Sequence, residues 1–229
     1  MHIPTTMSNT ANLQAIVRLQ TWLSPVFPIG GFSYSHGLER AVHDEIVQDE
    51  ESLSAWLQSL LAYGSPWNDA VLLVASWNKA GEGEAADLII ELGQAMAISK
   101  ERHLETMAQG KAFLDAIGEW PLPEDFNKPI EAPLPVAVGM ICSVMDVPVS
   151  AAVSTYLQAF INNQIQAAIR LSVIGQTAAA RIMANLESHI IALGEEAAQS
   201  TLDDLASASF QADIMAMNHE HQTTRLFRS

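Results

Sequence analysis

The sequence holds a single cysteine, Cys142, so no disulfide can form within the chain. This thiol lies in the apolar stretch 136–145, which predicts a buried and unreactive side chain. Basic residues are also scarce: 11 Lys and Arg stand against 26 Asp and Glu, a formal net charge of −15. Nucleic acids and anionic lipids bind through many Lys and Arg contacts to phosphate. Neither is therefore an expected partner.

Long hydrophobic runs are absent as well. The longest, 134–145, is interrupted by Ser143 and is too short for a hydrocarbon layer of about 30 Å. Residues 1–12 are polar and lack the apolar core of a signal peptide. We therefore expect a soluble cytoplasmic protein. Alternating β-branched runs are missing too, which argues against strands. Hydrophobic residues nevertheless make up 49% of the chain, enough for a substantial core.

Apolar residues recur at helical spacing along nearly the whole chain. Asp49 is placed to cap a helix that Gly64 ends, and Ser65 with Pro66 predicts the start of the next one. The stretch 136–145 is apolar on all sides, and the helix after Pro148 carries a stripe too wide for one partner helix. The expected helices cover residues 50–63, 66–78, 84–117 with a break at Gly93 or Ser99, 136–145, 148–174, 177–194 and 210–217.

Five prolines fall within residues 119–135, which predicts an exposed loop. Both halves of the chain around it are helical with one-sided apolar faces, so we expect one all-α domain over 1–229, with roughly eight to ten helices. Two short glycine motifs carry no chemistry. Gly81-x-Gly83 follows a helix rather than a strand, and residues 31–35 lack the strand and final glycine of a nucleophile elbow.

Two segments are unusual for a helical domain. The loop 24–38 combines two prolines and three glycines with Phe27, Ile29, Phe32 and Tyr34, which is typical of a loop that packs into a core or docks on a partner. We expect His36 to make structural hydrogen bonds there. The tail, residues 218–229, ends with Leu226 and Phe227 between two arginines. Because no core is evident for them, we expect both apolar side chains to be exposed for docking.

His219 and His221 are spaced i, i+2 and point to different faces of a helix. The favoured interpretation is a solvated segment with incidental histidines, and a weak, transient metal contact is the alternative. No second His or Cys cluster completes a closed coordination shell.

The motif Pro28-Ile-Gly-Gly-Phe-Ser-Tyr-Ser-His-Gly-Leu-Glu39 resembles the amino-terminal signature of the urease accessory protein UreF family. The closing Met217-Asn-His-Glu-His-Gln-Thr-Thr-Arg-Leu-Phe-Arg-Ser229 resembles that family's carboxyl-terminal signature. Stretches at 100–110, 135–139, 170–176 and 213–217 match in the same order. The family usually has Arg at Lys100, and Thr and Tyr at His221 and Thr223.

The resemblance implies a helical, homodimeric scaffold rather than an enzyme, with no catalytic residues and no tightly bound cofactor. It implies UreD (also called UreH), the GTPase UreG and apo-urease as partners, nickel as the delivered cargo, and regulation of GTP hydrolysis. The alternatives are a helical nickel-storage or nickel-sensing protein and an all-α metabolic enzyme.

Site residues follow from the two matching signatures. We assign the UreG side to Phe32, Ser33, Tyr34, His36 and Glu39. We assign the UreD side to Arg225, Leu226, Phe227 and Arg228, and a transient metal contact to His219 and His221. Arg225 is expected to fold back on the Phe32–Glu39 region and bond Glu39 or loop carbonyls.

Overall fold

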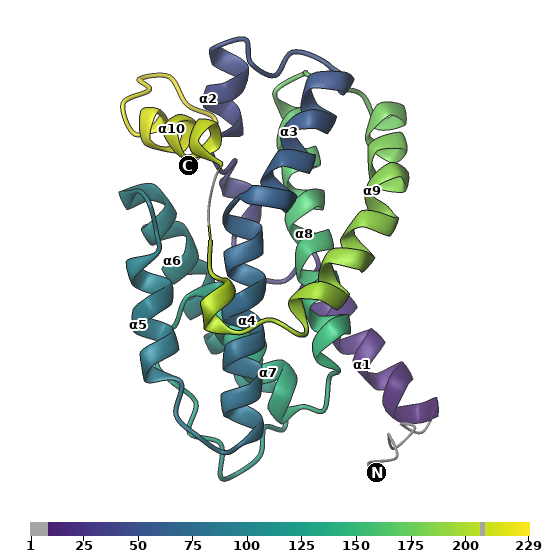
Figure 1. Cartoon of the computed structure of the whole chain (residues 1–229), viewed down its shortest axis with the longest axis vertical. Coiled ribbons are helices and arrows are strands. Elements are labelled where there is room, and N and C mark those ends of the chain that lie inside the picture. The colour runs from purple at the N-terminus through teal and green to yellow at the C-terminus, as the bar shows by residue number, and fades with distance from the viewer. Residues whose placement is uncertain (1–8, 207–208) are drawn as a thin grey trace.

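The computed structural model describes residues 9–206 and 209–229, and within these ranges the chain is helical and contains no strand. The predicted all-α fold is confirmed. The domain expected over 1–229 includes residues 1–8 and 207–208, which lie outside the described residues. The elements are α1 (Asn9–Trp22), η1 (Gly31–Ser33), α2 (Leu38–His43), α3 (Glu50–Tyr63), α4 (Ser65–Gly81), α5 (Asp87–Ala95), α6 (Lys100–Ala116), η2 (Ile117–Glu119), α7 (Leu134–Val144), α8 (Val149–Arg170), α9 (Gln176–Ala197), η3 (Leu202–Asp204) and α10 (Phe210–His219) (Figure 1). No helix in the described ranges is long and apolar enough to cross a membrane.

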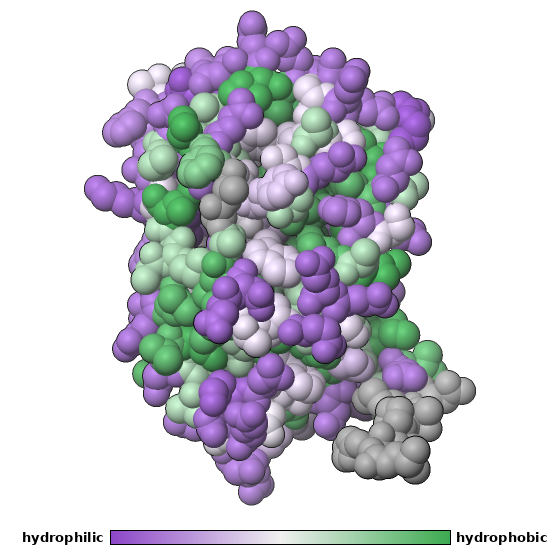
Figure 2. All heavy atoms as spheres, viewed as in Figure 1, coloured by the Kyte–Doolittle hydropathy of each residue, from purple (hydrophilic) through white to green (hydrophobic). Residues whose placement is uncertain are grey.

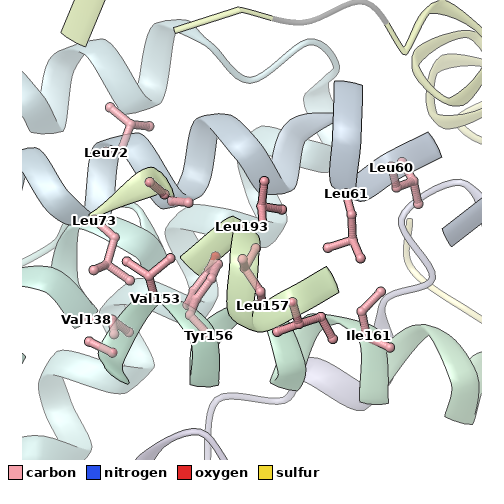
Figure 3. Close-up of a cluster of buried hydrophobic side chains, with 14 of the residues drawn as sticks. Leu60, Leu61, Leu72, Leu73, Val138, Val153, Tyr156, Leu157, Ile161 and Leu193 are labelled. Atoms are coloured by element: carbon pink, nitrogen blue, oxygen red, sulfur yellow. The ribbon is translucent and has the colours of Figure 1, made fainter. Parts of the chain in front are cut away.

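The core is built around α7 and α8. All residues from Pro135 to Cys142 are buried, as the apolar sequence predicts, and α7 packs most extensively on α4. The two helices approach closely at Gly139, where a Cβ would lie 2.2 Å from the Leu73 carbonyl oxygen. The α8 helix lies between α9, α4, α7 and the loop at η1, which confirms its central place. Figure 3 shows side chains from α3, α4, α7, α8 and α9 meeting in this core.

Cys142 is fully buried, and burial raises the pKa of its thiol to about 12. The thiol is therefore protonated at neutral pH, as the expectation of an unreactive side chain requires.

Most helix ends follow the local sequence. Asp49 caps α3 through a reciprocal pair of hydrogen bonds with Ser52, and Gly64 ends that helix. Gly64 also caps α4, so Ser65 is the first helical residue rather than the cap. The long pattern over 84–117 divides into α5 and α6, with Ser99 as the cap of α6. The break expected at Gly93 or Ser99 therefore falls at Ser99.

The predicted end of α9 at Gly194 is wrong. The helix continues to Ala197, and Gly194 faces α8, where a Cβ would lie 2.0 Å from the Ser154 hydroxyl. Glycine is needed at this position for close helix packing, and not for a turn.

The proline-rich loop is less exposed than expected at its carboxyl end. α7 already begins at Leu134, within the predicted 119–135 segment, and Ala132 and Pro133 are buried. Lys128 Nζ donates to the Leu114 carbonyl 2.8 Å away, which ties the middle of the loop to α6. Proline is tolerated in the first helical turn because the N–H it lacks has no intrahelical partner there.

Candidate functional site

The tail runs back along the loop 24–38, so the two unusual segments of the sequence form one site. The Arg228 N–H donates to the Ser33 carbonyl at 2.8 Å. The Ser35 N–H and hydroxyl both donate to the Ser229 carbonyl, at 2.7 and 2.5 Å. In Figure 1 the C-terminus lies beside α10, at the same end of the molecule as α2 and the upper end of α6.

Glu39, in the first turn of α2, holds the tail by its backbone. One carboxylate oxygen accepts from the Leu226 N–H at 2.7 Å, and the other accepts from the Phe227 N–H at 3.0 Å. The carboxylate is buried, and these charge-assisted bonds replace the water it has lost. Glu39 therefore acts as an anchor inside the chain.

His219, the last residue of α10, is fully buried between two carboxylates. Its Nε2 lies 3.0 Å from Glu39 and its Nδ1 lies 2.7 Å from Glu101 in α6. Carboxylates accept hydrogen bonds and do not donate them, so each ring nitrogen of His219 faces an acceptor. The second oxygen of Glu101 accepts from Arg225 Nη1. Acidic and basic groups thus alternate from α2 to the tail.

Phe227 packs into the core, with 4% of its surface exposed. The Arg170 guanidinium lies over its ring, 4.3 Å from the centroid, and donates to the Phe32 carbonyl at 2.6 Å. A cation over an aromatic face is a favourable contact. Arg170 therefore links the tail to the loop from the side of α8.

A second buried polar cluster lies beneath Ser229. The Ser229 hydroxyl donates to Glu105 at 2.8 Å, and Glu105 pairs with Arg102 at 2.6 Å. Arg102 lies 2.7 Å from Nδ1 of His36, whose Nε2 lies 2.7 Å from the Ser65 hydroxyl. The tail is therefore joined to α4 and α6 through this chain of side chains.

Burial and charge shift the pKa values in this cluster in opposite directions. Burial, helped by the Arg102 charge, lowers the pKa of His36 and keeps the ring neutral. Burial alone would raise the pKa of Glu105, but Arg102 and His36 together hold it well below its usual range. Burial raises the pKa of Asp69, which accepts a 2.8 Å bond from the Tyr156 hydroxyl. The groups neutralise one another, an arrangement suited to holding a conformation.

A cavity of about 140 Å³ opens beside this cluster. Its polar wall includes His36, Asp69, Arg102 and Glu105, and Phe32 lies at its apolar side. His36 itself has a φ of 59°, and Gly37 has a φ of 79°. Two successive residues in the left-handed region turn the chain sharply into α2, which points the Glu39 carboxylate at the tail.

The residues assigned to the UreG side divide by burial. Phe32 is 65% exposed and Ser33 is half-buried, whereas Tyr34, His36 and Glu39 are buried. The expected structural role of His36 is confirmed by its two ring contacts. Whether any of these residues meets UreG stays a prediction, and the three buried ones act on this surface through the shape of the loop.

The residues assigned to the UreD side also divide. Leu226 is 58% exposed and Arg228 is exposed, as expected. The expectation that Phe227 is exposed is wrong, because α8 and the loop provide a core for it. The expected bond from Arg225 to Glu39 is also wrong. Glu39 is occupied by backbone N–H groups of the tail, and Arg225 pairs with Glu101 instead.

The two histidines of the tail do not lie together. His221 is exposed, but His219 is buried with both ring nitrogens bonded, so the expectation of a solvated, incidental residue is wrong for His219. The i, i+2 spacing separated their faces correctly and could not show that one face packs on α2 and α6. Among the described residues, no group of three or more His, Cys, Asp or Glu is placed to hold a metal ion.

Sequence reasoning missed the charged side chains that α6 contributes. Arg102 and Glu105 are buried on this helix and Glu101 is half-buried beside them, and their signal was a helix with few apolar residues on any side. It also missed an exposed apolar stripe on α10, formed by Phe210, Ile214 and Met217 at 73%, 48% and 43% exposure. Their i, i+4, i+7 spacing is visible in the sequence, but spacing alone does not distinguish a core face from a surface face.

These features define a helical domain whose loop binds its own tail and whose charged groups serve structure. A sequence model of the UreF family matches residues 47–187. The chain is 54% identical over 216 residues to urease accessory protein UreF 1 of Brucella canis, covering 94% of each chain. It is 47% identical over 223 residues to urease accessory protein UreF of Mesorhizobium japonicum, covering 97% of this chain and 100% of the relative. The chain belongs to the UreF family.

Proposed function

We propose that this chain is a cytoplasmic scaffold for urease maturation, which joins UreD and the GTPase UreG so that nickel is inserted into apo-urease. The observation that carries the proposal is the docked tail. It presents Leu226, Arg228 and Arg225 at the surface while Phe227 fixes it to the core. Such a surface is shaped before any partner arrives, which lowers the entropy cost of binding.

The UreD side consists of Leu226 and Arg228 together with the α10 stripe, Phe210, Ile214 and Met217. Exposed apolar side chains, with an arginine on the same segment as Leu226, are typical of a protein interface. This surface also departs from the acidic character of the chain, which has a net charge of −15.

Arg225, which was expected on the UreD side, is proposed to face UreG because it pairs with Glu101. The UreG side then consists of Phe32, Ser33 and Arg225, with the buried Tyr34, His36 and Glu39 shaping it. Tyr34 supports it from below, where its carbonyl accepts from Asn163 at 3.0 Å. Because this surface is built on the tail and the loop together, UreG recruitment requires a docked tail. Contact with this surface is also proposed to regulate GTP hydrolysis by UreG. The measurement is the hydrolysis rate of UreG with and without this chain.

Pairing of two copies is part of the proposal, and α1 supports it. Leu13, Ile16 and Val17 are 63%, 51% and 61% exposed on one face of this helix. Hydrophobic residues reach the surface over α1 at the lower right of Figure 2. Arg18 is the single charged residue of α1. Two strongly acidic chains therefore meet with least repulsion there. Ile16→Glu is expected to convert a dimer to a monomer in light scattering.

The deciding experiment is co-purification of the tagged chain with the urease maturation proteins. We expect UreD and UreG to be retained by the natural chain, and Leu226→Glu to lose UreD. The matched control is Ile130→Glu, which places the same charge at an 85% exposed isoleucine in the proline-rich loop. Retention of both partners by Leu226→Glu contradicts the assigned surface. Tight stoichiometric nickel binding by the isolated chain in equilibrium dialysis favours a storage protein instead.

A further inference from the structure

Glu101 occupies a junction between the buried and exposed parts of the tail site. Its side chain is 14% exposed, while that of His219 is fully buried and that of Arg225 is 37% exposed. One carboxylate oxygen meets His219 and the other meets Arg225. The Glu101 carboxylate thus connects the buried His219 ring to the long Arg225 side chain at the surface.

The inner half of this junction is fixed from three sides. Glu101 lies in the first turn of α6, whose Lys100 N–H donates to Glu220 at 2.8 Å. Glu220 thereby ties the end of α10 to the start of α6, next to His219. The other nitrogen of His219 is held by Glu39. The Glu101 carboxylate therefore has little freedom to turn away from the tail.

Arg225, the outer partner of Glu101, has N–H donors that Glu101 does not use. A guanidinium carries five N–H donors in a rigid plane, and within the described part of the chain Arg225 is bonded to Glu101 through Nη1. An unrestrained arginine at the surface samples many rotamers, and ordering it costs free energy when a partner binds. Pairing with Glu101 restricts that freedom in advance and leaves one edge of the plane available.

We propose that Glu101 is a positioning residue of the UreG-binding surface, which aims the Arg225 guanidinium so that its free edge meets a carboxylate of the GTPase. The inference rests on the proposed recruitment of UreG. It assigns to Glu101 a role separate from docking the tail, because Glu39, Arg170 and Ser35 hold the tail through contacts that do not include Glu101.

The test uses Glu101→Gln in the full chain, bound to UreD, with UreG retention measured at physiological salt. Gln keeps the length of the side chain and an oxygen for His219, and removes the charge that holds Arg225. We expect UreG to bind roughly tenfold more weakly, the size of one partly buried charge-assisted hydrogen bond. Glu101→Gln combined with Arg225→Ala should bind no more weakly than Arg225→Ala alone, because both variants remove the same interaction.

Two further measurements separate positioning from a general structural effect. Hydrogen exchange at the Leu226 and Phe227 amides, which bond Glu39, should stay as slow in Glu101→Gln as in the natural chain. Glu50→Gln is the matched control, since it breaks the exposed Arg181 pair between α3 and α9 with the same change of charge. It should leave UreG binding unchanged.

Each remaining outcome overturns a definite statement. Fast exchange at the two amides in Glu101→Gln would make Glu101 a part of tail docking and reject the positioning role. Additive losses in the double variant would place its effect away from Arg225 and reject it too. If Arg225→Ala itself binds UreG normally, the proposed UreG surface fails, whereas normal binding by Glu101→Gln alone refutes only the positioning role.

Discussion

Truncating the Phe227 ring tests whether the tail is a structural part of the domain. The residue is 4% exposed and lies in the core, with Arg170 over its ring at 4.3 Å. Removing a buried phenylalanine ring costs about 1.5–3 kcal/mol in lost burial. The cation–π contact adds about 0.5–1 kcal/mol, since Arg170 is exposed. Phe227→Ala should therefore lower the free energy of unfolding by about 2–4 kcal/mol.

This value is an upper one because the tail can detach before the domain unfolds. The backbone bonds to Glu39 persist in the variant, and the loss of stability cannot exceed the free energy that docks the tail. For a domain of this size, each kcal/mol moves the midpoint by about 2–4 °C, so we expect a fall of roughly 5–15 °C. Thermal unfolding followed by circular dichroism measures it.

The neighbouring residue supplies the control. Leu226 is 58% exposed, so Leu226→Ala should change the unfolding free energy by less than about 0.5 kcal/mol. Equal and small shifts for the two variants would refute the reasoning, because they would mean that the Phe227 ring is not buried in solution. The expectation from the sequence that Phe227 is exposed predicts that result.

Three other outcomes follow from single residues. Gly37→Ala should destabilise the domain by more than about 1 kcal/mol, since φ is +79° and a Cβ would lie 2.9 Å from a backbone nitrogen of α10. Gly31→Ala should be tolerated because φ there is not positive, and denaturant titration compares the two variants. Because the pKa of His36 is lowered in the folded chain, the unfolded chain binds a proton more readily below pH 6.5, and the contribution of His36 to stability should be lost as the pH falls through 6.5. His36→Gln should flatten that part of the plot of unfolding free energy against pH. Cys142 should react with a thiol reagent only after unfolding, because burial raises its pKa to about 12.

The helices were predictable because each depends on residues close together in the chain. The cap at Asp49 lies three residues from its partner, and the apolar stretch that became α7 identifies a buried helix by its composition. Errors arose where a glycine has two uses. Gly194 was expected to end a helix, but it allows α8 and α9 to approach, and only the neighbouring helix decides between these roles.

The sequence identified most residues of the site but not the groups that they bind. Phe32, Glu39, Arg225 and Phe227 were all identified from the two matching motifs, yet the contacts expected of Glu39, Arg225 and Phe227 were wrong. Glu39 was expected to meet a partner or Arg225, and instead it binds the backbone of the tail. Backbone N–H groups have no side-chain signature, so a carboxylate that needs them looks identical in sequence to one that needs an arginine.

Two carboxylates bind different parts of the tail, and this division determines which contacts a binding partner can affect. Glu39 recognises backbone atoms, so its contacts survive nearly any substitution in residues 226 and 227, whereas Glu101 recognises the side chain of Arg225. Docking of the tail and presentation of its arginine are therefore carried by different carboxylates, with His219 between them. A partner can therefore bind the free edge of Arg225 while Glu101 keeps the guanidinium in place and Glu39 keeps the backbone docked. The surface can thus gain a charged contact while the tail stays in place.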